Sequence, residues 1–209
     1  FPKVHVTLID RNDVSLALAE RRKTELALTN MDIISADVQL WQPATPFQVG
    51  VAIHACGSLS DIIMEKCIGQ KASYVMAPCC FGALQNCDTS VICLPRSKSF
   101  STAGVTIEDY MSLASVADVN TSGGVLSNQY KTGKKAMAII DHDRNLRATQ
   151  EGYSTFQFTM RPATCTPKNE IICGISPAAI EDASMGFLTK EPTPLDFESA
   201  HPNLTIRVP

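Results

Sequence analysis

Two short motifs bring together the side chains of this sequence that are best suited to chemistry. They are HACG at residues 54–57 and PCCFG at residues 78–82. Each motif follows an apolar run, so each is predicted at the carboxyl end of a strand. His54 and Cys56 are two residues apart and should share one face of a strand, whereas Cys79 and Cys80 are adjacent and should not.

Three chemical roles fit these residues, besides plain packing in a core. A tetrahedral zinc site needs ligands that converge at about 2.0–2.3 Å, and the motifs lack the loop spacing of a zinc knuckle. A reactive thiol pair is disfavoured because adjacent cysteines close a strained ring and C-x-x-C is absent. The third role is the rim of a substrate site, with His54 as a general base. We favour this rim, lined by Cys56, Pro78, Cys79 and Cys80, and expect no metal; zinc is the less favoured interpretation.

Two carboxylates also stand at predicted strand ends. Asp10 ends the run VHVTLID, where a carboxylate can accept both hydrogen bonds of a ribose diol. Asp37 ends the next strand, where it can reach an adenine amino group. The alternatives are an acid at a helix N-terminus for Asp10 and a turn cap for Asp37. Together the two residues predict a site for a nucleoside-containing cofactor.

The elements that must position these residues alternate in type along the first half of the chain. The predicted strands are Val4–Asp10, Ile33–Val38, Val49–Cys56 and Ala72–Ala77, the last stopped by Pro78. The predicted helices are Val14–Leu28, capped by Asp13, and a segment from Ser58 or Ser60 to Ile68. This period predicts an α/β doubly wound parallel sheet, whose strand carboxyl ends line one crevice. We expect all four strands in one sheet.

The second half is less regular. The stretch Phe81–Thr106 is predicted as a long polar loop. Helices are predicted over Ile107–Asp118 and over Lys134–Gln150, the latter with an inward face of Ala136, Ile139, Ile140 and Leu146. The segment Asn120–Asn128 between them is predicted as another loop. Strands Tyr153–Met160 and Glu170–Ile175 should form an antiparallel hairpin. Residues 1–176 are therefore predicted as one domain, and residues 177–209 as a proline-rich tail.

A parallel sheet that ends in an antiparallel hairpin is informative about function. Dehydrogenases usually continue with parallel strands, whereas S-adenosylmethionine-dependent methyltransferases insert a reversed strand. The predicted fold class is therefore α/β, a Rossmann-like methyltransferase fold with a mostly parallel sheet that ends in an antiparallel hairpin. S-adenosylmethionine is the expected cofactor, and the rim described above would face the methyl acceptor.

Composition limits the partners and the compartment. The chain has 209 residues, with 18 Lys+Arg against 21 Asp+Glu, so bulk charge cannot bind nucleic acid. A basic group on one predicted helix is either a solvated face or a phosphate-binding stripe, and RNA is one candidate acceptor. It comprises Lys131, Lys134, Lys135, Arg144 and Arg147. No apolar run has the length of a membrane span, and the cysteines within apolar runs favour a reducing cytoplasm.

Several longer motifs resemble a known family. The segments HACGSLSDIIMEKCI, APCCFGALQN, GKKAMAIIDHDRNLRATQEGY and CTPKNEIICGIS occur in order between about Val4 and Ile175. They resemble the methyltransferase-like domain of the glutathione S-transferase C-terminal domain-containing protein family. A more distant resemblance is to eukaryotic tRNA ribose 2′-O-methyltransferases, which have histidine where Phe81 stands. The first resemblance implies a Rossmann-type methyltransferase fold in a cytoplasmic protein.

The resemblance also implies an upstream segment. The chain starts at Phe1 almost directly in a strand and contains no G-x-G-x-G motif. We therefore expect a fragment that lacks the first strand and the glycine-rich loop, with the upstream segment of its own parent chain as a partner. Alone, it should bind S-adenosylmethionine weakly and fold poorly. The alternative functions are a catalytically degenerate fold that serves as a binding module and, less favoured, a Cys/His metal or thiol site.

Overall fold

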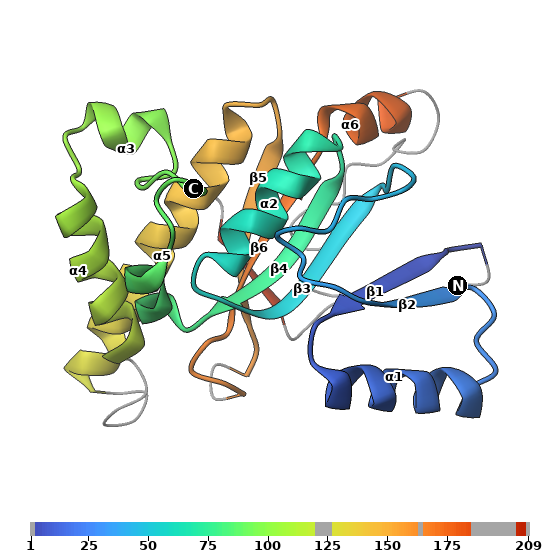
Figure 1. The fold of residues 1–209 in the computed structure, drawn as a ribbon. Coiled ribbons are helices and arrows are strands. Elements are labelled where there is room, and N and C mark those ends of the chain that lie inside the picture. Colours follow the sequence, from blue (N-terminus) through green and yellow to red (C-terminus); the bar gives the residue numbers. More distant parts are fainter. Residues whose placement is uncertain (1–2, 120–126, 163–164, 185–203, 208–209) are drawn as a thin grey trace. The chain divides into compact units, whose positions relative to one another are not determined.

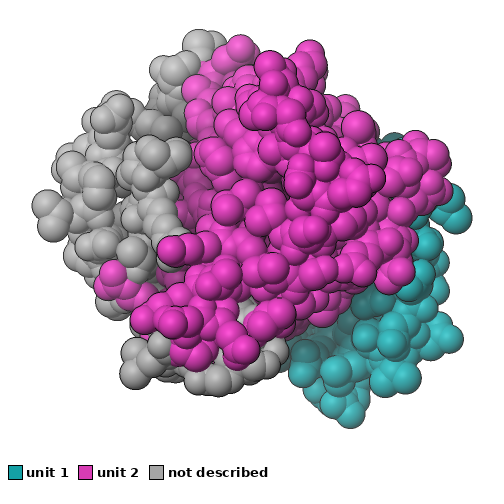
Figure 2. Space-filling view, turned by 90° about the vertical axis from the view of Figure 1, so that its left-hand side faces the viewer, with its two compact units in different colours: residues 1–46 teal, residues 47–209 magenta. Residues whose placement is uncertain are grey.

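The computed structural model describes residues 3–119, 127–162, 165–184 and 204–207. The chain divides into two compact units, residues 1–46 and residues 47–209, which Figure 2 distinguishes by colour. Each unit is described by itself.

The first unit is a strand–helix–strand motif. Strand β1 (Val6–Asp10) pairs in parallel with β2 (Met31–Ser35), and helix α1 (Asp13–Glu25) connects them. The cap of α1 is Asn12 rather than the predicted Asp13, because the Asn12 side chain accepts hydrogen bonds from two backbone N–H groups of the first turn.

The second unit is built on a five-stranded sheet in the order β3-β4-β6-β5-β7 (Figure 1). Only β3 and β4 are parallel, and the other neighbours are antiparallel. The bounds are β3 Val49–Cys56, β4 Ser73–Cys79, β5 Ser154–Met160, β6 Glu170–Ile175 and β7 Leu204–Arg207. The predicted antiparallel hairpin of β5 and β6 is confirmed.

Two parts of the predicted sheet are wrong. The four N-terminal strands lie in two sheets rather than one, since within the described residues β1 pairs with β2 and β3 pairs with β4. The larger sheet is mixed rather than mostly parallel, because the reversed strand β6 pairs with β4 directly. The molecule is therefore a mixed α/β protein.

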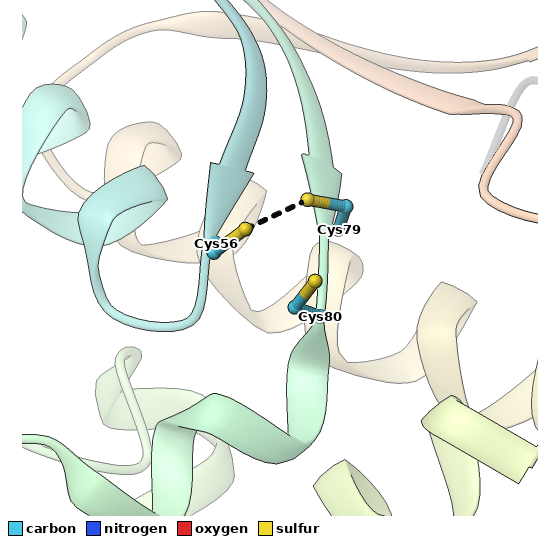
Figure 3. A group of neighbouring side chains, drawn as sticks. All are labelled: Cys56, Cys79 and Cys80. Carbon is cyan, nitrogen blue, oxygen red and sulfur yellow. Dashed lines mark hydrogen bonds between the residues drawn. The ribbon is translucent and has the colours of Figure 1, made fainter. Parts of the chain in front are cut away.

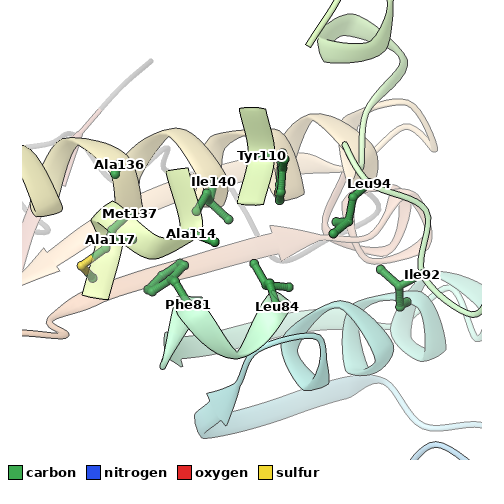
Figure 4. Packing of buried hydrophobic residues seen from close by; sticks show 10 residues of the cluster. All are labelled: Phe81, Leu84, Ile92, Leu94, Tyr110, Ala114, Ala117, Ala136, Met137 and Ile140. Carbon is green, nitrogen blue, oxygen red and sulfur yellow. The ribbon is translucent and has the colours of Figure 1, made fainter. Parts of the chain in front are cut away.

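The stretch predicted as a long loop contributes to the core. It contains a 3₁₀ helix, η1 (Phe81–Asn86), and a short helix, α3 (Lys98–Thr102). Its apolar side chains pack against α4 (Ile107–Asp118) and α5 (Asn128–Thr149) in a buried cluster (Figure 4). Those from the stretch are Phe81, Leu84, Ile92 and Leu94. The loop prediction failed because it weighed the polar residues of the stretch more than these spaced apolar ones.

Helix α5 begins at Asn128 rather than Lys134, and the Ser127 side chain caps it. Ala136 and Ile140 are buried as predicted, whereas Ile139 is 40% exposed. The rest of the buried face of α5 consists largely of charged and polar side chains, which are described below.

One face of the five-stranded sheet is covered by α5 and by α2 (Leu59–Gly69). Tyr74 of β4 lies on this face, and Gly174 of β6 is its partner in register. A Cβ atom at position 174 would stand 2.2 Å from the Tyr74 ring, so only glycine permits this close approach. On the other face, Val51 and Val75 are neighbours in register and remain 69% and 40% exposed.

Residues 177–209 contribute two described elements, α6 (Pro177–Ser184) and β7, which pairs with β5. The domain boundary at residue 176 stays a prediction, and the predicted loop Asn120–Asn128 lies largely outside the described residues. Among the helices that the structure describes, none has both the length and the apolar character needed to cross a bilayer.

Candidate functional site

The two predicted motifs meet at the carboxyl ends of β3 and β4. Cys56 and Cys79 are partners in register, and their Sγ atoms lie 3.2 Å apart. The Sγ atom of Cys80 joins them, so that all three sulfur atoms lie within 4.8 Å of one another. Figure 3 shows the side chains of the two strand ends turned toward the same space. Cys56 and Cys80 are exposed, and Cys79 is buried. We call these three residues the thiol cluster.

Unusual backbone on both strands forms the thiol cluster. A bulge interrupts β3 between Ile53 and Ala55, where His54 has φ of 58°. Cys80, directly after β4, has φ of 45°. The sequence predicted that Cys79 and Cys80 would not share one face of a strand. Cys80 lies beyond the end of β4, and its left-handed backbone brings its sulfur atom to the same space as that of Cys79. Such residues cost about 1–3 kcal/mol each and concentrate at functional sites.

The surroundings of Cys79 and Cys80 favour the protonated thiols. Burial, and then the neighbouring Cys56 thiol, raises the pKa of Cys79. The Cys56 thiol raises the pKa of Cys80, followed by burial and the nearby Asp118 carboxylate. A nucleophilic cysteine needs the opposite environment, one that stabilises the thiolate. Cys79 and Cys80 therefore do not resemble activated nucleophiles.

His54 and Pro78, the other residues of the predicted rim, lie near the carboxyl ends of β3 and β4, and the rim itself stays a prediction. His54 is exposed, and its carbonyl oxygen lies 3.4 Å from the Cys56 thiol, which donates to it. Pro78 is buried and does not stop β4, which continues to Cys79. The strand tolerates this proline because its pairing with β6 covers only residues 74–76, so the missing N–H breaks no bond there.

An ion pair that the sequence analysis missed positions the chain after the thiol cluster. The Asp118 carboxylate accepts hydrogen bonds from the backbone N–H groups of Phe81, at 3.0 Å, and Gly82, at 2.7 Å. Lys168 Nζ lies 2.6 Å from Asp118 Oδ1 and 5.3 Å from the centre of the Phe81 ring. Lys168 belongs to the motif CTPKNE, and this motif was the feature of the sequence that could have identified it. Its partner Asp118 is 50 residues away.

A buried network of charges lies behind the strand ends, centred on Arg144 of α5. Its Nη2 donates to Asp61 Oδ2 at 2.9 Å and to the Gly57 carbonyl at 3.0 Å, and its Nη1 donates to Asp141 at 3.0 Å. Arg96 Nε lies 3.1 Å from Asp61. The side chains of these four charged residues are at most 4% exposed. We call Asp61, Arg96, Asp141 and Arg144 the charge network.

The charge network corrects the predicted basic stripe. Arg144 points into the core instead of toward solvent, because two buried carboxylates pair with it. Lys134 pairs with Glu170, and Arg147 pairs with both Glu65 and Glu151. Three of the five basic residues of α5 therefore form ion pairs within the fold, whereas Lys131 and Lys135 are exposed.

The predicted cofactor carboxylates belong to the first unit. Asp10 ends β1, and its Oδ1 accepts a hydrogen bond from the Asn12 backbone N–H at 2.9 Å. Asp37 follows the end of β2, accepts from the Gln39 N–H and lies 3.6 Å from Arg11. Because β1 and β2 are parallel and Asp10 is in register with Ser35, both carboxylates stand at the same end of this sheet. That they share a crevice with His54 stays a prediction.

A surface depression of about 510 Å³ lies elsewhere, between the connection that follows α3 and helix α4, and is lined by residues such as Gly104 and Val116. None of the predicted site residues lines it. The candidate functional site is therefore assigned to the strand ends and not to this depression.

Comparisons with known proteins agree with the methyltransferase interpretation. A family model described as a methyltransferase domain matches residues 2–87, which include β1 to η1 and the whole thiol cluster. The Ribosomal RNA small subunit methyltransferase G of Pseudomonas paraeruginosa is 34% identical over 61 residues, which are 29% of this chain and 28% of that protein.

Longer matches are to proteins named Glutathione S-transferase C-terminal domain-containing protein. The Homo sapiens protein is 37% identical and the Mus musculus protein 36% identical, each over 174 residues. The Drosophila melanogaster homolog is 32% identical over 176 residues. These matches cover 83% of this chain, but only 26–29% of each relative.

Proposed function

Because the chain belongs to the family of glutathione S-transferase C-terminal domain-containing proteins, we propose that its methyltransferase domain binds S-adenosylmethionine in a Rossmann-like site. The chain spans about a quarter of the length of these relatives, so the proposal concerns this domain alone. The methyl group would move to an oxygen or nitrogen atom of an acceptor, for which RNA is the candidate that the similarity to a ribosomal RNA methyltransferase favours.

The observation that carries the proposal is the placement of Asp10 and Asp37. Both stand at the carboxyl end of a parallel strand–helix–strand motif, inside the region that matches the methyltransferase model. This is where open α/β sheets bind nucleotides. The hydrogen bond from the Asn12 N–H orients the Asp10 carboxylate, which can then accept from a ribose diol.

The proposed roles follow from the chemistry of methyl transfer. The reaction is an in-line displacement at a sulfonium methyl group, so the protein mainly aligns the reactants. A base is needed only when the attacking atom carries a proton, and His54 is the residue proposed for it. Cys56, Pro78, Cys79 and Cys80 would line the acceptor side. We propose the cytoplasm as the compartment, where all eight cysteines stay reduced and outside disulfides.

Calorimetry with Asp10→Ala in the full chain tests the cofactor site. Loss of charge-assisted hydrogen bonds should weaken S-adenosylmethionine binding by about 1–3 kcal/mol. Asp32→Ala is the matched control, because it removes an exposed carboxylate of the same unit, which pairs with His5 instead of standing at a strand end. Equal affinities of the two variants, with intact folds, would remove Asp10 from the site. Unimpaired binding without transfer to any RNA would favour the degenerate binding module.

A further inference from the structure

The thiol cluster has the donor set of a metal site. Three sulfur atoms lie within 4.8 Å of one another, and two of them come from residues that are exposed to solvent. In a tetrahedral zinc site with Zn–S bonds of about 2.3 Å, the sulfur atoms stand about 3.8 Å apart. The Cys56–Cys79 separation of 3.2 Å and the 4.8 Å limit for the other pairs bracket this value. Shifts of about 1 Å or less would therefore complete three Zn–S bonds.

The backbone supports a dedicated arrangement. Alternation along a regular strand would send the side chains of Cys79 and Cys80 to opposite faces. The left-handed conformation of Cys80 removes this separation, and the bulge at His54 accompanies the register that sets Cys56 opposite Cys79. Both strands thus depart from regular geometry at the residues that bring the sulfur atoms together.

The electrostatic surroundings explain what a metal would supply. The groups around Cys80 include the thiols of Cys56 and Cys79 and the carboxylate of Asp118. None of these three groups carries a positive charge that could stabilise a thiolate. Three thiolates in this space would repel one another. A soft divalent cation binds them only as thiolates, releases their protons and compensates their charge.

We propose that Cys56, Cys79 and Cys80 bind one zinc ion, with the fourth coordination position left to water or to an atom of a bound substrate. Zinc accepts three cysteine ligands, and sites with three protein ligands keep an open position. The exposure of Cys56 and Cys80 leaves a route for the ion and for the fourth ligand. The proposal does not depend on methyl transfer, because metal binding is measured without cofactor or acceptor.

The test uses the full chain, reduced, stripped with a chelator and titrated with Co²⁺ or Zn²⁺. We expect one equivalent of Co²⁺, with the sulfur-to-cobalt charge-transfer bands and the visible bands of a tetrahedral thiolate site, and displacement by Zn²⁺. Cys80→Ser and Cys56→Ser should each lower the affinity about 100-fold, since even the loss of residues that only support a ligand costs 10–100-fold. Both positions are exposed, so these variants should fold.

Cys165→Ser is the matched control, because Cys165 is an exposed free cysteine outside the thiol cluster. It should bind Co²⁺ like the unaltered chain. Equal affinities of Cys80→Ser and the unaltered chain would overturn the proposal. The proposal would also be overturned by a disulfide between Cys56 and Cys79, together with no cobalt spectrum in the reduced protein. Mass spectrometry would show this disulfide as a loss of two hydrogen masses that reduction restores.

Discussion

The thiol cluster and the charge network lie on either side of Gly57 and differ in almost every physical respect. Arg144 donates to the Gly57 carbonyl, and the Gly57 N–H donates to the Cys79 carbonyl at 3.4 Å. In the charge network, every member is buried and bound to an oppositely charged partner. In the thiol cluster, two members face solvent, and hydrogen bonds join the Cys56 thiol to the Cys79 thiol and to the His54 carbonyl. The first is closed and structural, whereas the second is open to a ligand.

The difference shows that neighbouring polar groups near the same strand ends have different roles. A buried ion pair adds little net stability compared with apolar residues of similar shape, but removal of one partner is costly. The charge network therefore fixes the position of the strand ends. The thiol cluster has strained backbone and partners of weak hydrogen-bonding strength, so its residues are better explained by what they could bind.

Arg144→Met should have the largest effect. The substitution leaves the buried carboxylates of Asp61 and Asp141 without their main cation, which should lower the free energy of unfolding by about 3–5 kcal/mol. Urea denaturation measures this loss. Arg147→Met is the control on the same helix, because its partner Glu65 is 33% exposed, and it should cost about 1 kcal/mol or less. Similar losses of stability in the two variants would contradict the distinction between the buried charge network and the partly exposed ion pair of Arg147.

Asp141→Asn should change the pH dependence of stability. Burial raises the pKa of Asp141 from 3.8 to about 7, although Arg144 opposes this. The contribution of Asp141 to stability is fully present below the pKa that its carboxyl group has in the unfolded chain. It is lost as the pH rises through the pKa in the folded chain, because folding must then bury an ionised carboxylate. Between pH 5 and pH 8 the unaltered chain should lose about 3 kcal/mol that the variant keeps. Parallel stability curves over this range would show that Asp141 is ionised throughout.

Cys80→Gly, which removes one sulfur atom from the thiol cluster, should have the smallest effect on stability. Glycine adopts φ of 45° without strain, so the free energy of unfolding should stay unchanged or rise by up to about 1 kcal/mol. Thermal melts of the metal-free, reduced protein measure it. A loss of more than about 1 kcal/mol would mean that the Cys80 thiol itself holds the strand end in place.

Several elements could be predicted from the sequence alone. Strand β3, helix α4 and strand β6 have the predicted bounds, because each is an apolar or amphipathic run that ends at a residue with strong local preferences. The meeting of the HACG and PCCFG motifs was also predictable, since both follow strands that are close in sequence. Their parallel pairing is confirmed.

The rest depends on contacts that a local pattern does not encode. The bulge at His54 and the left-handed Cys80 change side-chain directions by one residue each, which no periodicity reveals. Arg144 has the sequence context of a solvated helix face, and only its long-range partner Asp61 shows that it is buried. Likewise, Lys168 acquires a role only when the fold brings Asp118 beside it.

The fit of Tyr74 over Gly174 sets a rule for how this family can vary. The tyrosine hydroxyl donates to Asn145, so its ring is held at both ends while it occupies the space of the missing side chain. A larger residue at position 174 is compatible with the fold only if position 74 becomes smaller at the same time. We therefore expect a relative with a larger residue at position 174 to have a smaller one at position 74, a hundred residues away. A sequence with large residues at both sites marks a different arrangement of the hairpin against β4.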